Sequence, residues 1–189
     1  MTIQQWDESL LLRLNSWLGM SSGFDTLIKI VAVYSIYTVP FILVFLWFKK
    51  IREAGVRAAL SGLIFWLVVS PLIAEVWFRP RPPLAELGGQ ELLFHRPTYS
   101  FPSDHAGFLA AITLTFYLNG YRNIAAAFFV LTIIVSLARI AVGFHFPTDI
   151  LGGWVIGALI ALVIHYSRNS IDRYLSRPAI RLAQRFRLA

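Results

Sequence analysis

The sequence predicts an all-α fold, a polytopic membrane helical bundle of about five transmembrane helices with an N-terminal interfacial helix. Its 189 residues are 57% hydrophobic and only 14% charged, whereas soluble domains are roughly 45–50% apolar and roughly 25% charged. The apolar residues also fall into long runs, each near the ~20 residues that a helix needs to cross a bilayer. The sequence shows no repeat and no second domain, so we expect one membrane-embedded domain over residues 1–189.

The first segment, residues 1–23, mixes apolar and polar residues in a pattern that favours a helix lying along the membrane surface. Its apolar residues are Trp6, Leu10, Leu11, Leu12, Leu14, Trp17 and Leu18, and its polar residues include Gln4, Asp7, Arg13 and Asn15. A surface helix packed on the bundle would show the same pattern, so both arrangements stay open.

The transmembrane bundle is expected over residues 24–166. Its five spans are predicted at residues 26–48, 57–78, 103–118, 124–142 and 149–166. Pro40 lies inside the first span and predicts a kink there, because proline removes a backbone donor and its ring clashes with the preceding turn. The third span is the shortest and is closed by the polar stretch "NGYRN".

The basic residues predict the orientation of the chain in the cell membrane. Eleven of its 17 Lys and Arg residues fall on one side, namely Lys49, Lys50, Arg52, Arg57, Arg122, Arg168, Arg173, Arg177, Arg181, Arg185 and Arg187. By the positive-inside rule this side is cytoplasmic, and residues 167–189 form a basic cytoplasmic tail. The net charge of +7 therefore indicates anionic lipid headgroups as partners and not nucleic acid.

The outer side then receives two polar stretches that are far apart in the sequence, "SFPSDHAGF" and "ARIAVGFHFPTDILGG". Together with the loop between the second and third spans they supply Arg79, Arg81, Ser103, Asp104, His105, Arg139, His145 and Asp149. Arginine matches phosphate oxygens through its planar fork of donors and does not lose its charge. Several arginines beside two histidines and a carboxylate indicate a site for phosphate chemistry.

The predicted starts of the third and fifth spans support this hypothesis. Ser103 follows a proline and is predicted to be the N-cap of the third span, so that His105 lies beside the free backbone donors of the first turn. Thr148 is predicted to be the N-cap of the fifth span, with Asp149 in its first turn. A carboxylate near His145 can hold one ring nitrogen and leave the other free to attack.

These residues resemble the signature of the type 2 phosphatidic acid phosphatase superfamily, whose pattern is KxxxxxxRP, PSGH and SRxxxxxHxxxD. The third motif is matched by Arg139, His145 and Asp149, with Ala138 where the family has serine. The second appears as "PSDH", with Asp104 in place of glycine. Within this superfamily the chain is similar to bacterial undecaprenyl pyrophosphate phosphatases.

The first motif survives only as "RPRP", which begins at Arg79 and contains Arg81. The residue seven positions before each arginine is Leu72 or Ala74, so the lysine of the family is missing. The second arginine of "RPRP" is a candidate to replace that positive charge.

The resemblance implies a mechanism and roles for the matched residues. His145 attacks phosphorus to form a phosphohistidine, Asp149 orients it, and His105 acts as general acid and then as general base. The phosphate-binding set implied is Arg79, Arg81, Ser103, Asp104 and Arg139. For Asp104 we expect a role in shaping the pocket, through a pair with Arg96 or Arg81. No metal or other cofactor is expected, because the arginines neutralise the phosphate.

The expected reaction is hydrolysis of undecaprenyl or another polyprenyl pyrophosphate to the monophosphate and phosphate, at the outer face of the membrane, as cell wall synthesis requires. Hydrolysis of phosphatidylglycerophosphate, phosphatidic acid or lipid A would use the same residues, and a lipid phosphotransferase stays open as well. A non-catalytic lipid-binding or permease-like protein is the alternative from another class. The sequence indicates no obligate protein partner.

Overall fold

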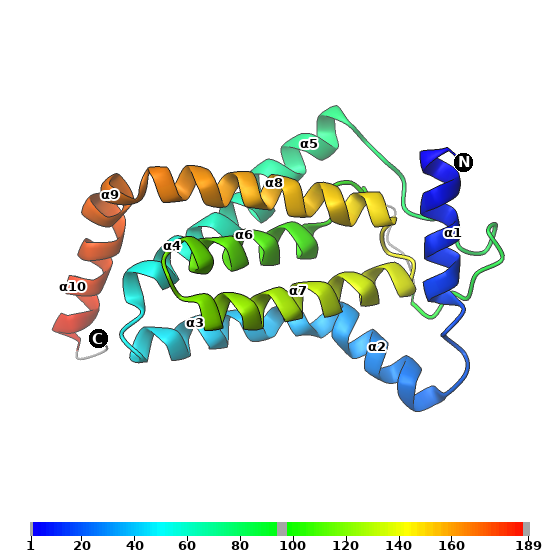
Figure 1. Cartoon of the computed structure of the whole chain (residues 1–189), viewed down its shortest axis with the longest axis horizontal. Coiled ribbons are helices and arrows are strands. Elements are labelled where there is room, and N and C mark those ends of the chain that lie inside the picture. The colour runs from blue at the N-terminus through cyan, green and yellow to red at the C-terminus, as the bar shows by residue number, and fades with distance from the viewer. Residues whose placement is uncertain (1, 94–97, 187–189) are drawn as a thin grey trace.

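The computed structural model of the protein describes residues 2–93 and 98–186. These residues form helices and connecting loops without any strand, as the composition predicts. Figure 1 shows the long helices running side by side along the long axis of the molecule. The helices are α1 (Ile3–Asn15), α2 (Ser22–Tyr34), η1 (Ser35–Tyr37), α3 (Thr38–Phe48), α4 (Arg52–Ile64), η2 (Phe65–Val69), α5 (Ser70–Val76), α6 (Asp104–Leu118), α7 (Arg122–Ala141), α8 (Pro147–Tyr166), α9 (Arg168–Ile171), η3 (Asp172–Ser176) and α10 (Arg177–Arg185).

Four continuous helical stretches are long and apolar enough to cross a membrane, namely Ser22–Phe48, Arg52–Val76, Arg122–Ala141 and Pro147–Tyr166. The remaining predicted span, the third, corresponds to α6, which has only 15 residues and would reach about 22 Å at the usual rise of a helix. It lies inside the bundle, where it packs against α4, α7 and α8. The protein is therefore an all-helical membrane protein, with α6 as its central helix.

The first span is interrupted where Pro40 predicts a kink. The α-helical pattern stops at Tyr34, continues as the 3₁₀ turn Ser35–Tyr37, and resumes at Thr38. Because the ring of a proline clashes with the carbonyl four residues earlier, the irregular turn falls at the place where Pro40 disturbs the helix. The second span contains a π-helical turn, Phe65–Val69, directly before Ser70.

Close contact between α6 and α8 depends on glycine. A Cβ atom on Gly157 would meet the backbone carbonyl oxygen of Gly107, and a Cβ atom on Gly107 would meet the ring of Phe65. Backbone atoms cannot move aside as a flexible side chain can, so the two helices approach at a distance that only glycine allows. This contact fixes the start of α6 beside the start of α8.

Short helices close the two ends of the bundle. Figure 1 shows α1 lying across one end and α9 and α10 lying across the other. Leu11 and Leu14 of α1 are buried, and the Asn15 side chain donates to the backbone oxygen of Ala141 at 2.8 Å. Helix α1 is thus packed on the end of the bundle, and its position along the membrane surface stays a prediction.

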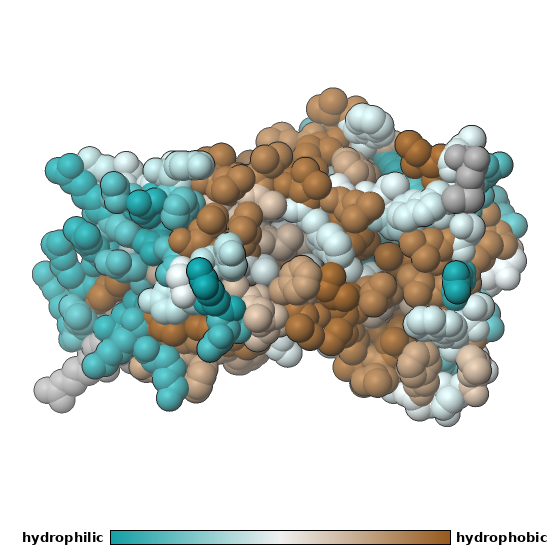
Figure 2. All heavy atoms as spheres, in the orientation of Figure 1, coloured by the Kyte–Doolittle hydropathy of each residue, from teal (hydrophilic) through white to brown (hydrophobic). Residues whose placement is uncertain are grey.

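The opposite end carries the basic residues. Figure 2 shows hydrophilic residues gathered over α9 and α10 and a broad hydrophobic surface across the middle of the molecule. Arg57, one of the basic residues near a span end, is buried and contacts Asp172 at 2.5 Å. It also donates to the side-chain oxygen of Asn119 at 2.6 Å. These bonds attach the start of the C-terminal segment to the bundle.

Candidate active site

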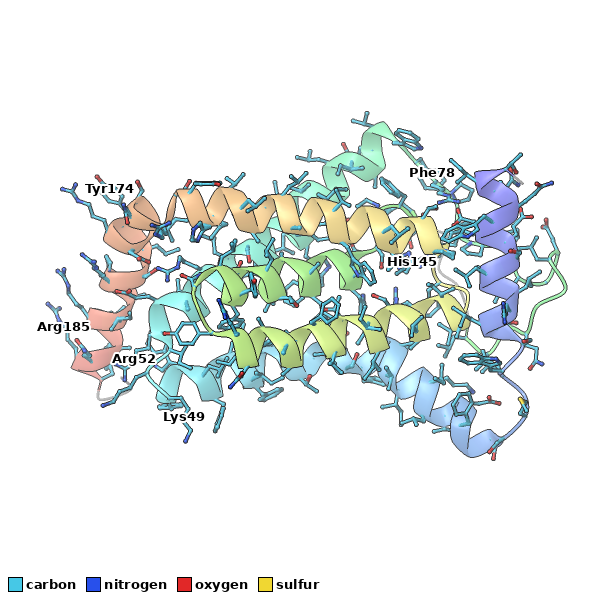
Figure 3. The ribbon with its side chains drawn as sticks, in the orientation of Figure 1. Lys49, Arg52, Phe78, His145, Tyr174 and Arg185 are labelled. Atoms are coloured by element: carbon cyan, nitrogen blue, oxygen red, sulfur yellow. The ribbon has the colours of Figure 1, made fainter. Side chains whose placement is uncertain are left out.

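The polar residues that the motifs single out lie together at the end of the bundle beneath α1. Figure 3 labels His145 at this end, beside Phe78, with Lys49, Arg52 and Arg185 at the other end. The backbone N–H of Ser103, at the start of α6, donates to the carbonyl oxygen of Asp149 in α8 at 3.1 Å. The two polar stretches of the sequence therefore meet.

His145 lies in the loop between α7 and α8 and is 1% exposed. Its Nδ1 is 2.8 Å from the carbonyl oxygen of Ser100, and its Nε2 is 3.1 Å from a terminal nitrogen of Arg139. A carbonyl oxygen only accepts, so Nδ1 carries the proton and Nε2 keeps its lone pair. Burial, and then the positive charges of Arg139 and Arg81, hold the pKa of His145 well below its usual value. The ring is neutral, and the lone pair of Nε2 faces Arg139.

Asp149 binds the groups that surround His145, and its Oδ2 lies 3.9 Å from Nδ1 of that ring. Its Oδ2 accepts from the hydroxyl of Ser100 at 2.5 Å and from the backbone N–H of Phe146 at 2.7 Å. Its Oδ1 accepts from Arg79 at 2.6 Å. The carboxylate thus acts on the ring through Ser100, whose own carbonyl oxygen holds Nδ1. Ser100 is not among the site residues predicted from the sequence, because it lies outside the three motifs. Its hydroxyl group was the only signal for it.

The start of α8 differs from the prediction. Thr148 was expected as N-cap, but the helix begins at Pro147, with Phe146 as N-cap. Pro147 is suited to the first helical position because its fixed φ and missing N–H cost nothing there. Asp149 then occupies the third position, from which its carboxylate reaches back to the N–H of Phe146.

The two arginines of "RPRP" have different surroundings. Arg79 donates to Asp149 and to Thr148 at 2.6 Å each, and to Asp7 at 2.8 Å. Arg81 donates to the carbonyl oxygen of Phe144 at 2.6 Å. All hydrogen bonds that the Arg79 side chain donates go to other side chains of the protein. The positive charge of Arg81, in contrast, contributes to the lowered pKa of His145.

Three buried polar atoms around His145 have no hydrogen-bond partner among the described residues. They are Oγ of Ser103, Nε2 of His105 and Nε of Arg139. Ser103 occupies the N-cap position of α6 as predicted, but its side chain makes no capping bond. Buried polar atoms are normally paired, so atoms that lack a partner mark the place of a polar ligand. Two donors and a histidine at a helix start fit an anion with several oxygens.

Asp104 points toward neighbours that the sequence did not suggest. Its carboxylate accepts from the hydroxyl of Ser70 at 2.5 Å and lies 3.3 Å from that of Tyr99. Burial raises the pKa of Tyr99, so this hydroxyl stays protonated and can donate. Of its two expected partners, Arg96 lies outside the described residues, and the hydrogen bonds of Arg81 go to Phe144 and Thr98.

The described residues contain no group of three or more His, Cys, Asp or Glu side chains that could hold a metal ion. The positive charge of the site comes from Arg81 and Arg139, which reach it from a loop and from the end of α7.

The fold and the site together define an integral membrane phosphatase of the helical-bundle class. Residues 55–173 match the PAP2 superfamily, and the chain belongs to that superfamily. It is 30% identical to the undecaprenyl-diphosphatase BcrC of Bacillus subtilis over 146 residues, which cover 76% of this chain and 74% of that protein.

Two solved structures share the fold. LpxE of Aquifex aeolicus superimposes with a TM-score of 0.70 at 21% identity, covering 87% of this chain and 98% of the other. A PAP2-type phosphatidylglycerolphosphate phosphatase of Bacillus subtilis gives a TM-score of 0.69 at 21% identity, covering 91% of this chain and 89% of the other. The arrangement of helices is therefore common to this chain and both of these proteins.

Proposed function

We propose that this protein hydrolyses undecaprenyl pyrophosphate, or a closely similar polyprenyl pyrophosphate, to the monophosphate and inorganic phosphate at the outer face of the cell membrane. The observation that carries the proposal is that three of the buried side-chain atoms without partners in the described part of the chain belong to residues of the motifs: Oγ of Ser103, Nε2 of His105 and Nε of Arg139. A terminal phosphoryl group supplies the acceptor oxygens that Ser103 and Arg139 lack.

In the first step Nε2 of His145 attacks the terminal phosphorus. The bond from nitrogen to phosphorus forms as the bond to the bridging oxygen breaks, and the polyprenyl monophosphate leaves. The negative charge of the bound pyrophosphate offsets the positive charges of Arg139 and Arg81, so His105 is protonated in the complex and gives its proton to the departing oxygen. The bond from Arg139 to Nε2 is exchanged for bonds to the phosphoryl oxygens, so binding of the substrate releases the lone pair that attacks.

In the second step water replaces His145 on phosphorus. His105, now neutral, takes a proton from that water, and the bond between phosphorus and Nε2 breaks to give inorganic phosphate. The positive ring of the phosphohistidine is stabilised through its Nδ1 proton, which the carbonyl oxygen of Ser100 accepts. Asp149 holds Ser100 in that position through the 2.5 Å bond to its hydroxyl.

The choice of a polyprenyl substrate is supported by the relatives. BcrC of Bacillus subtilis is named an undecaprenyl-diphosphatase, and a relative in Sulfolobus acidocaldarius that is 27% identical over 126 residues has the same name. The hydrophobic surface of the bundle suits a substrate with a long apolar tail (Figure 2). Phosphatidylglycerophosphate is the alternative substrate that a relative favours, because a Bacillus subtilis protein that is 26% identical over 134 residues is named phosphatidylglycerophosphatase B.

The test is phosphate release by the purified protein in detergent with excess EDTA. Undecaprenyl pyrophosphate, phosphatidylglycerophosphate, phosphatidic acid and lipid A are compared at equal surface concentration, with His145→Ala as the inactive control. We expect the highest kcat/KM on undecaprenyl pyrophosphate and none in the variant. Higher kcat/KM on another lipid would overturn the substrate, and transfer of phosphate to an added lipid in place of water would indicate a phosphotransferase.

A further inference from the structure

We propose that Asp7, in the N-terminal helix α1, is a positioning residue for the phosphatase reaction. It acts through Arg79 and Thr148 on Asp149 and so on the orientation of His145. The inference rests on the proposed function, because it assigns a role in the same reaction. It also assigns Arg79 to the support of the nucleophile and leaves Arg81 as the arginine of "RPRP" that faces the phosphoryl group.

Asp7 is fully buried beneath α1. Its Oδ1 accepts from the backbone N–H of Thr148 at 2.9 Å. Its Oδ2 accepts from the hydroxyl of Thr148 at 2.5 Å and from Arg79 at 2.8 Å. Two of these bonds fix the first turn of α8, which begins two residues after His145.

The bonds continue from Asp7 to the nucleophile without a gap. Arg79 uses its other terminal nitrogen to donate to Asp149 at 2.6 Å. Asp149 accepts from the hydroxyl of Ser100, and the carbonyl oxygen of Ser100 holds Nδ1 of His145. Arg79 therefore bridges two carboxylates, and neither of its terminal nitrogens is left unpaired.

Attachment of α1 to the bundle does not require a charge. Leu11 and Leu14 already bury the apolar face of this helix, and a buried carboxylate is costly unless it is paired. A buried ion pair adds little stability over a well-packed apolar pair, but it fixes geometry. Asp7 also lies outside residues 55–173, which match the superfamily, so α1 contributes to the site from outside the matched region.

The test compares Asp7→Asn with Glu8→Gln, which removes the same charge from the neighbouring residue of α1. Glu8 contacts Gln4 within its own helix. Asp7→Asn keeps the size of the side chain, but it leaves one accepting oxygen for the three donors of Arg79 and Thr148 and removes the negative charge opposite Arg79, so the bridge is weakened. We expect kcat to fall about 10–100-fold, as for other residues that orient a reacting group, with KM near the wild-type value and Glu8→Gln unchanged.

A double-mutant cycle with Arg79→Gln separates a positioning role from direct phosphate binding. If Arg79 acts through Asp149 as Asp7 does, the two substitutions together lower kcat little more than Arg79→Gln alone. If Arg79 binds phosphate and Asp7 only attaches α1, the two effects multiply and KM rises in each Arg79 variant. The second result would overturn the inference.

Hydrogen exchange gives a measurement that does not depend on activity. The amide of Thr148 should exchange faster in Asp7→Asn than in the wild type or in Glu8→Gln, because it loses its acceptor. Should Asp7→Asn fail to fold, Thr148→Val removes only the hydroxyl bonds to Asp7 and Arg79, and the same fall in kcat is expected.

Three outcomes are distinguishable. Wild-type kcat and exchange in Asp7→Asn, with an active wild-type protein, would overturn the role of Asp7 and leave the proposed function intact. An inactive wild-type protein on every lipid would overturn the proposed function. If kcat falls in Asp7→Asn, and Glu8→Gln loses as much thermal stability as Asp7→Asn does, α1 is merely structural and the inference is overturned.

Discussion

At the scale of single residues, the site is organised around the two nitrogens of His145. Nδ1 meets a carbonyl oxygen, which fixes its proton, and Nε2 meets Arg139. In the proposed reaction Arg139 exchanges this bond for bonds to the substrate. The orientation of a nucleophilic histidine usually involves a second group that accepts from the nitrogen not used for attack. Here that group is the backbone of Ser100, and Asp149 stands one bond further away.

The lowered pKa of His145 can be measured directly. Because burial and the charges of Arg139 and Arg81 disfavour the protonated ring, lowering the pH from 7 to 6 should leave it neutral. Carbon-13 NMR of labelled histidine in detergent should show a resonance that titrates with a midpoint below 6.5 and that is missing from His145→Ala. The chain has four histidines, so the assignment is simple. A midpoint at or above 6.5 would contradict the account.

Asp104 gives a second prediction at this scale. Asp104→Gly restores the residue of the family motif, but it deprives the buried hydroxyl of Ser70 and that of Tyr99 of their shared acceptor. An unsatisfied buried group costs about 1–3 kcal/mol, and we expect the pocket to rearrange and kcat to fall about tenfold, equivalent to roughly 1.4 kcal/mol. Tyr99→Phe, which removes only one donor, should have a smaller effect. Unchanged turnover in Asp104→Gly would rule out a role in shaping the pocket.

The sequence could identify residues whose spacing carries the chemistry, but not those that reach the site through tertiary packing. Arg139, His145 and Asp149 lie at the fixed spacing of a motif, on a helix end, a loop and the next helix start. Such spacing can be recognised from the sequence alone. Asp7 lies 141 residues from Thr148, and its place among polar residues of α1 fits a solvated face equally well. Arg79 and Arg81 each precede a proline, so only their partners distinguish them.

At the scale of elements, the contact between α6 and α8 positions the two halves of the site. Gly157 lets α8 meet the backbone of α6 at Gly107, and the bond from Ser103 to the carbonyl oxygen of Asp149 joins the starts of the two helices. Any change that separates these helices should therefore widen the site.

Gly157→Ala tests this contact. Its added methyl group would meet the backbone oxygen of Gly107, and overpacking of this kind costs about 1–3 kcal/mol. We expect a lower melting temperature in detergent and a lower kcat. The matched control is Gly55→Ala in α4, where a Cβ atom meets nothing within 4 Å and stability should rise by about 0.4–1 kcal/mol. Equal melting temperatures for the two variants would argue against close packing as the role of Gly157.

The helices themselves were largely predictable, because long apolar runs and proline positions follow from the solvent and the backbone. The apolar run of the first span and Pro40 within it predicted a helix with an internal irregularity. The predicted start of α8 was wrong. Thr148 was expected to be the N-cap, but Pro147 occupies the first helical position, so Phe146 is the N-cap. The π-helical turn was not predicted, although Pro71 is its signal in the sequence, because the proline ring clashes with the carbonyl of Leu67 inside that turn.

At the scale of the whole molecule, the site and the basic residues lie at opposite ends of the bundle (Figure 3). By the positive-inside rule we predict from this separation that the site lies outside the cell. Because the chain has no cysteine, single cysteines can report the orientation. Cysteine in place of exposed Glu86 should react with a membrane-impermeant maleimide in intact cells. Cysteine in place of exposed Arg185 should react only after the cells are permeabilised, and the reverse pattern would place the site inside.

The central claim is that Nε2 of His145 becomes covalently bound to phosphorus. The most direct measurement is to mix the protein with undecaprenyl pyrophosphate labelled with ³²P in its terminal phosphate, stop the reaction in alkali within milliseconds, and locate the label by peptide mapping. We predict a base-stable, acid-labile label on the peptide that contains His145, absent from His145→Ala and accumulating in His105→Ala, which lacks the base for the second step. Label on His105, or rapid turnover with no label on any histidine, would contradict the account.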